Sequence, residues 1–298
     1  MSHGPADVRR TLRGILLIST AVLLFAVMDA ISKYLTRFYP VACILWVRYL
    51  FYTLAIVAVT HRRLGWRLFR TTRPGIQLLR GVLPPISALC FVLALKYLPI
   101  AETSAITFVS PMLVALLAVA FLGEKVSRGQ WLAILSGFVG VLIIVRPGTG
   151  VFAWASLLPL ACAMLMAVYH VLTRRIAGLE SVYTSTFYPG LIGLLVLSLA
   201  LPFTWTAPQG AAHLGLLGLA GIISAASHLC LIKAYDYASA SRLAPFTYSQ
   251  MVWATALGYL VFGDFPDAWS LAGIAILAAG GLYLANNLRR PPPPATTA

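Results

Sequence analysis

Long apolar runs, each ended by charged residues, proline or glycine, dominate the pattern of this sequence. A helix needs roughly 20 apolar residues to cross the hydrocarbon core of a bilayer. Runs such as MLVALLAVAFL at 112–122 lack the alternation expected of a membrane β-barrel. The pattern therefore predicts an all-α polytopic membrane protein with ten transmembrane helices. We expect them near residues 14–36, 41–60, 76–98, 102–122, 128–146, 151–173, 181–203, 211–236, 240–262 and 267–287.

Short stretches of the first half recur in the second. FLGEKVSRGQWLAI at 121–134 is answered by VFGDFPDAWSLAGI at 261–274, so that a glycine followed by an acid breaks the apolar pattern in both. In a neighbouring register, AVMDAISKY at 26–34 lies over AVYHVLTRR at 167–175. Five helices per copy is an odd number, so the second copy enters the membrane from the opposite side. Such inverted repeats are typical of secondary transporters, which bind substrate near the midplane between the halves.

The repeat predicts how the chain is divided. We expect a first five-helix repeat with helices 1–5 at residues 1–148 and an inverted second repeat with helices 6–10 at residues 149–288. The proline-rich residues 289–298 are interpreted as a disordered tail.

Composition supports a membrane location, and the placement of charge gives an orientation. Of the residues, 60% are hydrophobic and 10% charged, with a formal net charge of +14. Basic residues gather on the side of the predicted bundle that holds both termini; the exceptions are Lys33, Arg37, Arg48, Lys96 and Arg146. The positive-inside rule then predicts cytoplasmic N- and C-termini. The same asymmetry explains the high charge without a nucleic-acid partner, and the basic 62–80 segment is expected to contact anionic lipid headgroups.

Two longer segments resemble a known family. The segment LKYLPIAETSAITFVSPMLVALLAVAFLGEKVSRGQWLAILSGFVGVLIIV at 95–145 and its echo at 232–281 are similar to the two EamA repeats of the drug/metabolite transporter (DMT) superfamily. Lys33 and Arg48 stand where that family usually carries basic residues, whereas Met251 replaces the proline that Pro111 keeps in the first half. The resemblance extends over nearly the whole chain.

The resemblance also implies an activity and a location. The stretch APFTYSQMVWA at 244–254 is similar to a bacterial subset that includes YddG-like aromatic amino-acid exporters and carriers of S-adenosylmethionine. The resemblance thus implies an amino-acid exporter, aromatic amino acids included, in the bacterial inner membrane, working by alternating access. Carriage of S-adenosylmethionine or a related metabolite is the alternative. Direction of transport rests on the resemblance alone.

Ionisable residues inside apolar runs need an explanation, since each costs roughly 2.5–3.5 kcal/mol to insert. Asp29 and its repeat counterpart His170 are candidate substrate-binding residues, or else each is satisfied by a neighbour and holds helices together. His228 has the same two interpretations, with proton coupling as a further option. Lys33 and Arg48 lie within helical reach of Asp29, and Lys33 is its i+4 neighbour. They are interpreted as a structural ion pair or an outer gate.

Aromatic and small polar residues inside the predicted helices suggest a cavity. Trp and Tyr usually gather at membrane interfaces, so an interior set is informative. An apolar cavity with a few polar groups is typical of a small-molecule site, and this one suits amino acids with large apolar side chains better than sugars or phosphates. The further candidate substrate-binding residues are Phe91, Phe108, Ser110, Tyr169, Phe246, Tyr248, Gln250 and Trp253.

Prolines inside apolar runs remove helix hydrogen bonds and mark bending points. Pro84, Pro85, Pro111 and Pro245 are the predicted hinges. The small-residue runs SGFVG and AGIAILAAGG, in the fifth and tenth predicted helices, allow close backbone packing, either within the chain or between copies. We favour packing within the chain.

Other function classes find no support in the sequence. The runs contain no HExxH or Gly-x-Ser-x-Gly motif and no paired acids of a membrane enzyme. A channel would need a ring-like selectivity sequence, and an ATP-driven pump a P-loop; neither is present. The expected partners are a small-molecule substrate and the lipid bilayer. We expect no catalytic residue, metal or cofactor, and the sequence is compatible with either a monomer or a homodimer.

Overall fold

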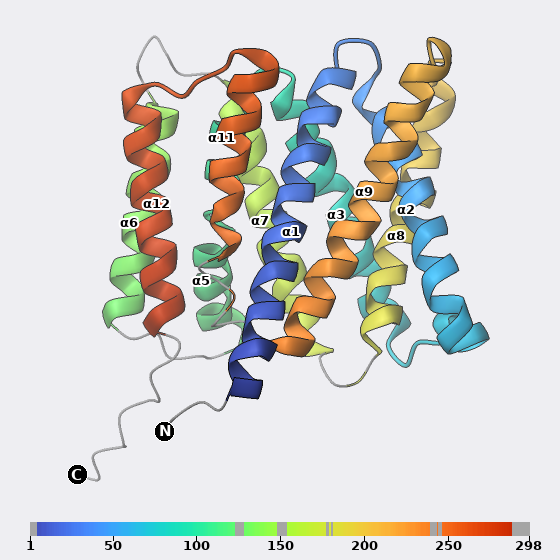
Figure 1. Ribbon diagram of the computed structural model, residues 1–298, viewed down its shortest axis with the longest axis horizontal. Coiled ribbons are helices and arrows are strands. Elements are labelled where there is room, and N and C mark those ends of the chain that lie inside the picture. The colour runs from blue at the N-terminus through green and yellow to red at the C-terminus, as the bar shows by residue number, and fades with distance from the viewer. Residues whose placement is uncertain are drawn as a thin grey trace.

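The computed structural model consists of α-helices packed side by side, with two short 3₁₀ turns (Figure 1). It describes residues 5–122, 128–147, 154–176, 179, 181–238, 243 and 246–287. In chain order the elements are α1 (Pro5–Leu35), α2 (Val41–Leu64), η1 (Gly65–Phe69), α3 (Pro74–Leu95), α4 (Ile100–Thr107), α5 (Ser110–Leu122), α6 (Arg128–Val145), η2 (Trp154–Ser156), α7 (Leu157–Arg175), α8 (Val182–Thr204), α9 (Gly210–Tyr237), α11 (Ser249–Phe262) and α12 (Ala268–Asn287).

Many of these helices have the length and composition of membrane spans. Within the described chain, 7 segments are long and apolar enough to cross a bilayer, and two shorter apolar helices are found at Trp131–Val145 and Ala268–Tyr283. The seven are Arg9–Leu35, Val41–Thr60, Pro74–Leu95, Ile100–Phe121, Trp154–Thr173, Tyr183–Thr204 and Gly210–Tyr237. The all-α class expected from the apolar pattern is confirmed.

Two of the differences between helix boundaries and apolar runs have a clear physical reason. Helix α1 begins at Pro5, although its apolar run begins at 14. The change from polar to apolar side chains near residue 14 marks where the helix meets solvent. It does not end the helix, because the backbone hydrogen bonds do not depend on side-chain polarity. The fourth predicted span is divided into α4 and α5, because Pro111 has no N–H to give to the preceding turn. The break puts Pro111 in the first turn of α5, where no donor is needed.

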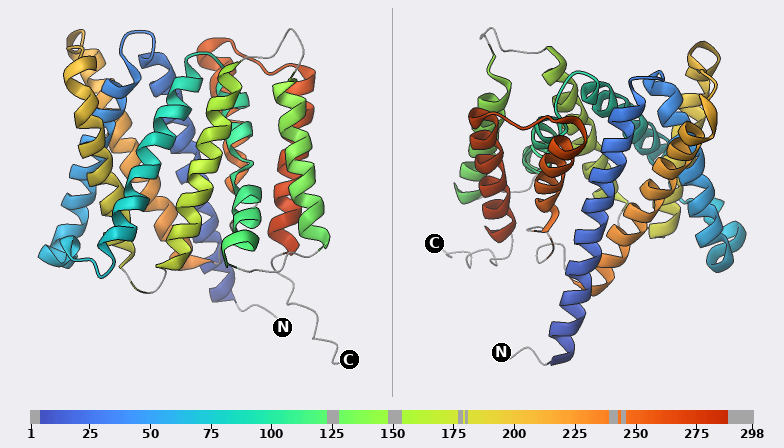
Figure 2. Two further views of the ribbon diagram at one scale, coloured as in Figure 1. Left: turned by 180° about the vertical axis from the view of Figure 1, so that it is seen from behind. Right: turned by 45° about the horizontal axis from the view of Figure 1, so that its top comes forward.

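Helices from distant parts of the chain pack against each other. Helix α1 packs along α9, α3 along α7, and α6 along α12, while α2 contacts both α8 and α9 (Figures 1 and 2). A large apolar core lies between α4, α5, α6, α7, α11 and α12. A Cβ atom placed on Gly140 would lie 2.9 Å from the carbonyl oxygen of Gly273, and the reverse contact would be 2.7 Å. Small residues therefore bring α6 and α12 together within one chain.

The bundle has two distinct ends. Helix α1 begins and α12 finishes at one of them, which we call the termini end (Figure 1). The opposite end holds the links at 36–40, 96–99, 205–209 and 263–267.

Candidate functional site

A cavity of about 1040 Å³ lies inside the bundle. Residues of α1, α2, α3, α4, α5, α7, α8, α9 and α11 line it. Thr173 and Tyr235, which lie two residues before the last residues of α7 and α9, are part of the lining. Both helices finish at the termini end (Figure 2). The lining of the cavity therefore reaches that end of the molecule.

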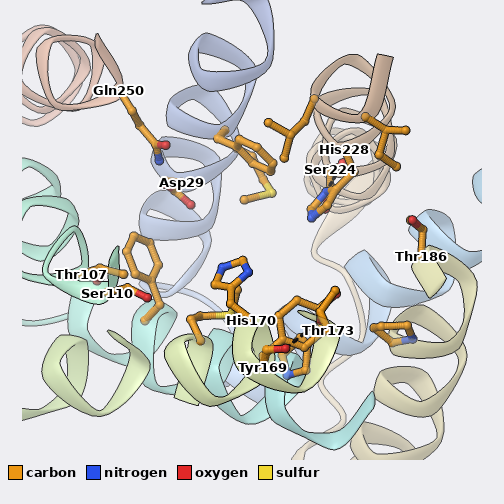
Figure 3. Close-up of a pocket in the computed structure, with 18 of the residues that line it drawn as sticks. Asp29, Thr107, Ser110, Tyr169, His170, Thr173, Thr186, Ser224, His228 and Gln250 are labelled. Carbon is orange, nitrogen blue, oxygen red and sulfur yellow. Dashed lines mark hydrogen bonds between the residues drawn. The ribbon is translucent and has the colours of Figure 1, made fainter. Parts of the chain in front are cut away.

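Most of the substrate-binding candidates line this cavity. Figure 3 shows Asp29, His170, His228 and Gln250 pointing into it from four different helices. Arg48, expected at a gate or in an ion pair, also lines it. The complete set of predicted binding residues on the cavity is Asp29, Phe91, Phe108, Ser110, Tyr169, His170, His228 and Gln250.

Three binding candidates lie elsewhere. Phe246 packs against a small apolar cluster that includes Ile18. Tyr248 lines a separate, smaller groove between α11 and α12, with its ring 5.3 Å from that of Phe108. Trp253 is 39% exposed on α11. Helix α11 is apolar on all sides, so its pattern does not tell which face is turned toward the cavity.

The predicted hinges also separate. Pro84 and Pro111 line the cavity, and Pro85 is buried within α3. Pro245 lies outside the described residues.

Asp29 and Arg48 bring opposite charges to the cavity without a direct contact between them. They are 4% and 7% exposed, respectively. In the described chain, no hydrogen bond or ion pair joins either side chain to another residue, although the two charges interact electrostatically. The Arg48 guanidinium lies 5.9 Å from the centroid of the Tyr49 ring. The expected ion pair of Asp29 with Arg48 or Lys33 is therefore not formed.

Aromatic rings surround His228 beside these charges. The His228 Nδ1–H donates to the carbonyl oxygen of Ser224 at 2.8 Å, which leaves Nε2 for another partner. The Phe25 ring lies 5.0 Å from the imidazole and the Tyr52 ring 5.3 Å, both edge to face. Phe25 is one helical turn before Asp29, and Tyr52 one turn after Arg48. The sequence did not single out Phe25 and Tyr52 as cavity residues, because aromatic residues are common in apolar helices.

The place of Arg80 was not predicted from the sequence either. It was assigned to a basic flank, yet it is 1% exposed. Its guanidinium donates to Gln77 Oε1 at 3.1 Å, to the Tyr169 hydroxyl at 3.2 Å and to the Ser185 carbonyl oxygen. The available signal was its position four residues inside the apolar run 76–98. Arg80 thereby supports a wall of the cavity through Tyr169.

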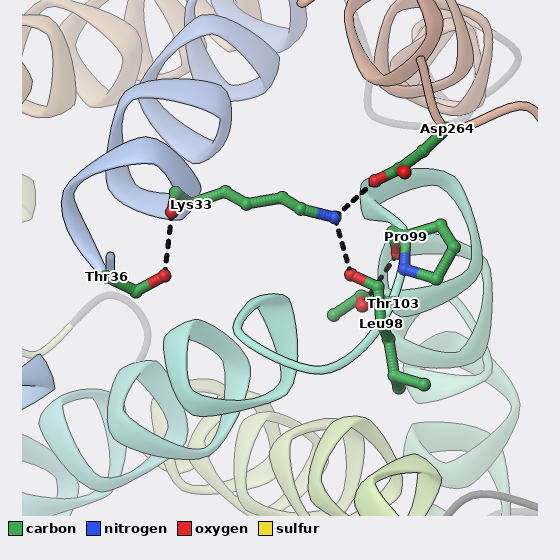
Figure 4. Close-up of polar contacts among 6 residues, drawn as sticks. All are labelled: Lys33, Thr36, Leu98, Pro99, Thr103 and Asp264. Atoms are coloured by element: carbon green, nitrogen blue, oxygen red, sulfur yellow. Dashed lines mark hydrogen bonds and ion pairs between the residues drawn. The ribbon is translucent and has the colours of Figure 1, made fainter. Parts of the chain in front are cut away.

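Lys33 joins three segments at the opposite end of the bundle. Its Nζ donates to Asp264 Oδ2 at 2.7 Å and to the Leu98 carbonyl oxygen at 2.9 Å (Figure 4). The ammonium also lies 5.2 Å from the centroid of the Phe262 ring. The predicted pairing of Lys33 with Asp29 is wrong, because Lys33 extends away from its own helix toward the α11–α12 link.

Other polar contacts link the same end. The Gln209 N–H donates to the Tyr39 hydroxyl oxygen at 2.7 Å, and that hydroxyl lies 2.8 Å from His213 Nδ1. Ser270 Oγ donates to Glu102 Oε1 at 2.8 Å. Together with Lys33, these bonds join the first half of the chain to the second half at this end, and none of the bonded residues lines the cavity.

Comparisons with known proteins agree with a membrane transporter. The EamA-like transporter family model matches residues 12–146 and again residues 153–286. A riboflavin transporter of Rhizobium johnstonii is 31% identical over 295 residues, which cover 96% of this chain and 95% of that protein. A riboflavin transporter of Vibrio cholerae is 33% identical, with 92% and 93% covered. An S-adenosylmethionine uptake transporter of Rickettsia felis is 26% identical, with 86% of each chain covered.

A solved structure supports the fold as well. One crystal structure superposes with a TM-score of 0.65 at 19% identity, covering 93% of this chain and 99% of that one. An apolar helical bundle with an internal cavity and a double match to one transporter model leads to a single assignment. The chain belongs to the EamA-like transporter family.

Proposed function

We propose that this protein carries a planar heteroaromatic metabolite of the riboflavin type across a membrane by alternating access. The carrying observation is the cavity, whose lining reaches the termini end, while polar bonds join the two halves of the chain at the opposite end. Its volume of about 1040 Å³ matches sites for drug-sized ligands, which occupy roughly 300–1,000 Å³. Its lining combines aromatic rings with one carboxylate and one guanidinium among the described residues.

The packing of the helices supports two inverted halves, divided as 1–148 and 149–288. Helix α1 packs on α9 as α7 packs on α3, and α1 contacts α11 as α7 contacts α5. In the repeat, α1 corresponds to α7, α3 to α9, and α5 to α11. When each helix is replaced by its counterpart, the first contact of each comparison becomes the second. In Figure 1, α1 rises from the termini end whereas α7 descends toward it. We therefore infer a ten-span carrier whose halves share the cavity.

Orientation follows from the positive-inside rule. With both termini in the cytoplasm of a bacterial cell, the cavity faces inward and the links around Lys33 close the outer side. Export remains the predicted direction, and assays with substrate on either side of the membrane measure it.

Two relatives support riboflavin over the aromatic amino acids expected from the sequence. Both riboflavin transporters exceed 30% identity over more than 90% of the chain, and neither they nor the Rickettsia protein is named as an amino-acid carrier. A single aromatic amino acid would also leave much of the cavity empty. The neutral tricyclic ring of riboflavin fits the aromatic walls, and its polyol chain has room toward the termini end.

S-adenosylmethionine is the second candidate. One relative carries it by name, and Asp29 beside Phe25 offers a carboxylate and an aromatic face to a cation. Asp29→Asn should abolish this transport.

Uptake into proteoliposomes tests the proposal. Purified protein is reconstituted, and initial rates are measured for radiolabelled riboflavin, S-adenosylmethionine and tryptophan, with protein-free vesicles as the control. We expect saturable riboflavin flux that exceeds the other two. Saturable flux of S-adenosylmethionine or tryptophan without riboflavin flux would overturn the riboflavin assignment. The same panel with and without an imposed pH gradient measures proton coupling.

A further inference from the structure

Asp29 and Arg48 are the two charged residues among the described residues that line the cavity. Both are more than nine-tenths buried, and no hydrogen bond or ion pair in the described chain satisfies either one. Unpaired charges in a membrane interior are costly and usually mark function. Here both have room in front of them, because each is part of the cavity wall.

The pair lies at the deep end of the cavity. Helix α1 runs away from the termini end, and α2 runs back toward it (Figure 1). Phe25, one turn before Asp29, and Tyr52, one turn after Arg48, are therefore both nearer the termini end. His228 contacts both rings. A ligand that enters from the termini end meets the aromatic rings along its length and the two charges at its leading edge.

These features define the ligand edge that would fit. It must offer a donor to Asp29 and an acceptor to Arg48, and the ligand should be neutral overall because the two cavity charges cancel. An α-amino acid head group satisfies the pair, but the sulfonium of S-adenosylmethionine would then face no second carboxylate among the described lining residues. The pyrimidine edge of a flavin carries carbonyl, N–H and carbonyl in a row, next to a flat aromatic system.

We propose, resting on the proposed riboflavin transport, that Asp29 accepts a hydrogen bond from the imide N–H of the flavin ring while Arg48 donates to an adjacent carbonyl oxygen. The rings of Phe25, Tyr52 and His228 then contact the ring system. Residues Asp29 and Arg48 thus determine specificity, and the polyol chain trails toward the termini end.

A ligand change tests this without altering the protein. In 3-methylriboflavin a methyl group replaces the imide hydrogen, and the ring and the polyol chain stay the same. Binding to purified protein is measured through quenching of flavin fluorescence. We expect the methylated ligand to bind roughly 10- to 100-fold more weakly, because it leaves a buried carboxylate without its donor. Equal affinity for the two flavins would overturn the inference while leaving riboflavin transport intact.

Variants complete the test. Asp29→Ala, which removes the acceptor, should weaken riboflavin binding at least tenfold and remove most of the difference between the two flavins. Arg48→Gln should weaken both flavins alike, since the carbonyl is present in each. The control is Asp236→Asn, an exposed acid outside the cavity, which should bind both flavins like the wild type.

Two further outcomes separate the claims. An Asp29→Ala protein that keeps the full discrimination against 3-methylriboflavin would contradict the inference alone. Absence of any riboflavin binding or flux in the wild type would overturn the proposed function, and with it this inference.

Discussion

Asp267 stabilises the start of α12 through two contacts. Its Oδ1 accepts the Ser270 N–H at 2.7 Å, which satisfies a backbone donor that the first turn leaves free. Its Oδ2 pairs with Arg146 at 2.5 Å. The Ser270 backbone N–H, with help from Arg146, holds the pKa of the Asp267 carboxyl below its usual value. The contact therefore stabilises the fold only while the carboxyl is ionised.

Asp267→Ala should lower the free energy of unfolding by about 1 kcal/mol at pH 7, the usual effect of losing a helix cap. Because the pKa is lower in the folded state, this stabilisation is present above the unfolded pKa of roughly 3.9 and is lost as pH falls through the folded pKa. Thermal unfolding in detergent at pH 7 and in steps below pH 4 measures it. Asp267→Asn, which keeps an acceptor, is the control. A deficit that does not shrink in acid would contradict the assignment.

Single residues show where sequence reasoning was limited. Asp29, His170 and His228 could be singled out because a charge or imidazole in an apolar run is rare. The partner of Lys33 could not, since Asp264 is 231 residues away and the local i,i+4 rule pointed to Asp29. Arg80 was assigned to the surface because basic residues at helix ends usually reach water, whereas here Gln77, Tyr169 and Ser185 surround it.

Helices α6 and α12 meet through glycines, and this contact has a measurable consequence. A Cβ atom on Gly273 would lie 2.5 Å from Ile144 Cγ1 and 2.7 Å from the Gly140 carbonyl oxygen. Gly215, inside α9, has nothing within 4 Å of the same position. The two glycines are therefore opposite cases, one required by packing and one free to change.

Gly273→Ala should destabilise the protein by roughly 1–3 kcal/mol through overpacking. Gly215→Ala should be neutral or stabilise it by up to about 1 kcal/mol, because alanine has the higher helix propensity. Thermal unfolding of both variants, followed by tryptophan fluorescence, compares them. Equal effects of the two substitutions would contradict the close α6–α12 contact.

At the scale of elements, the sequence was most informative about where helices lie. Apolar runs marked the described helices because lipid requires about 20 apolar residues per span. The apolar run at 102–122 is interrupted just before Pro111, between α4 and α5. The face that a helix turns toward the cavity was harder to predict. Helix α11 is apolar all round, so Gln250 could be recognised as unusual. Nothing in the pattern indicated that Tyr248 and Trp253 lie off the cavity.

The joining of segments at the opposite end is a property of the whole molecule, because Lys33 bonds to segments of both halves. Lys33→Ala should loosen it and expose the deep part of the cavity, where Ser104 is 1% exposed. A Ser104→Cys reporter is introduced after the four native cysteines are replaced. The reaction of Cys at this position with a membrane-impermeant maleimide, added on the side opposite the termini end, should then accelerate several-fold.

The control for this experiment removes a different cation at the same end. Lys96 is exposed, and its ammonium lies 5.8 Å from the centroid of the Tyr97 ring. Among the described residues, no hydrogen bond or ion pair joins this side chain to another residue. Lys96→Ala should leave the labelling rate unchanged. An unchanged rate in Lys33→Ala would show that the Lys33 contacts do not close the cavity.

For the whole molecule, the sequence pointed to the family but not to the substrate. The motifs at 95–145 and 232–281 lie at helix packing positions and links, which many members of one fold need. Substrate choice depends on a few cavity residues contributed by different helices, and their proximity is visible only in the folded chain. Asp29, Arg48 and the rings beside them, which we propose bind the substrate, are brought to one cavity in this way.

The central claim is that one shared cavity binds riboflavin and opens to each side in turn. Counterflow tests it most directly: vesicles preloaded with unlabelled riboflavin are diluted into a trace of radiolabelled riboflavin. A carrier with a single alternating site should accumulate label transiently above its equilibrium level, because outward movement of unlabelled substrate returns the site to the outside. Label that only equilibrates, or never enters, would contradict the account.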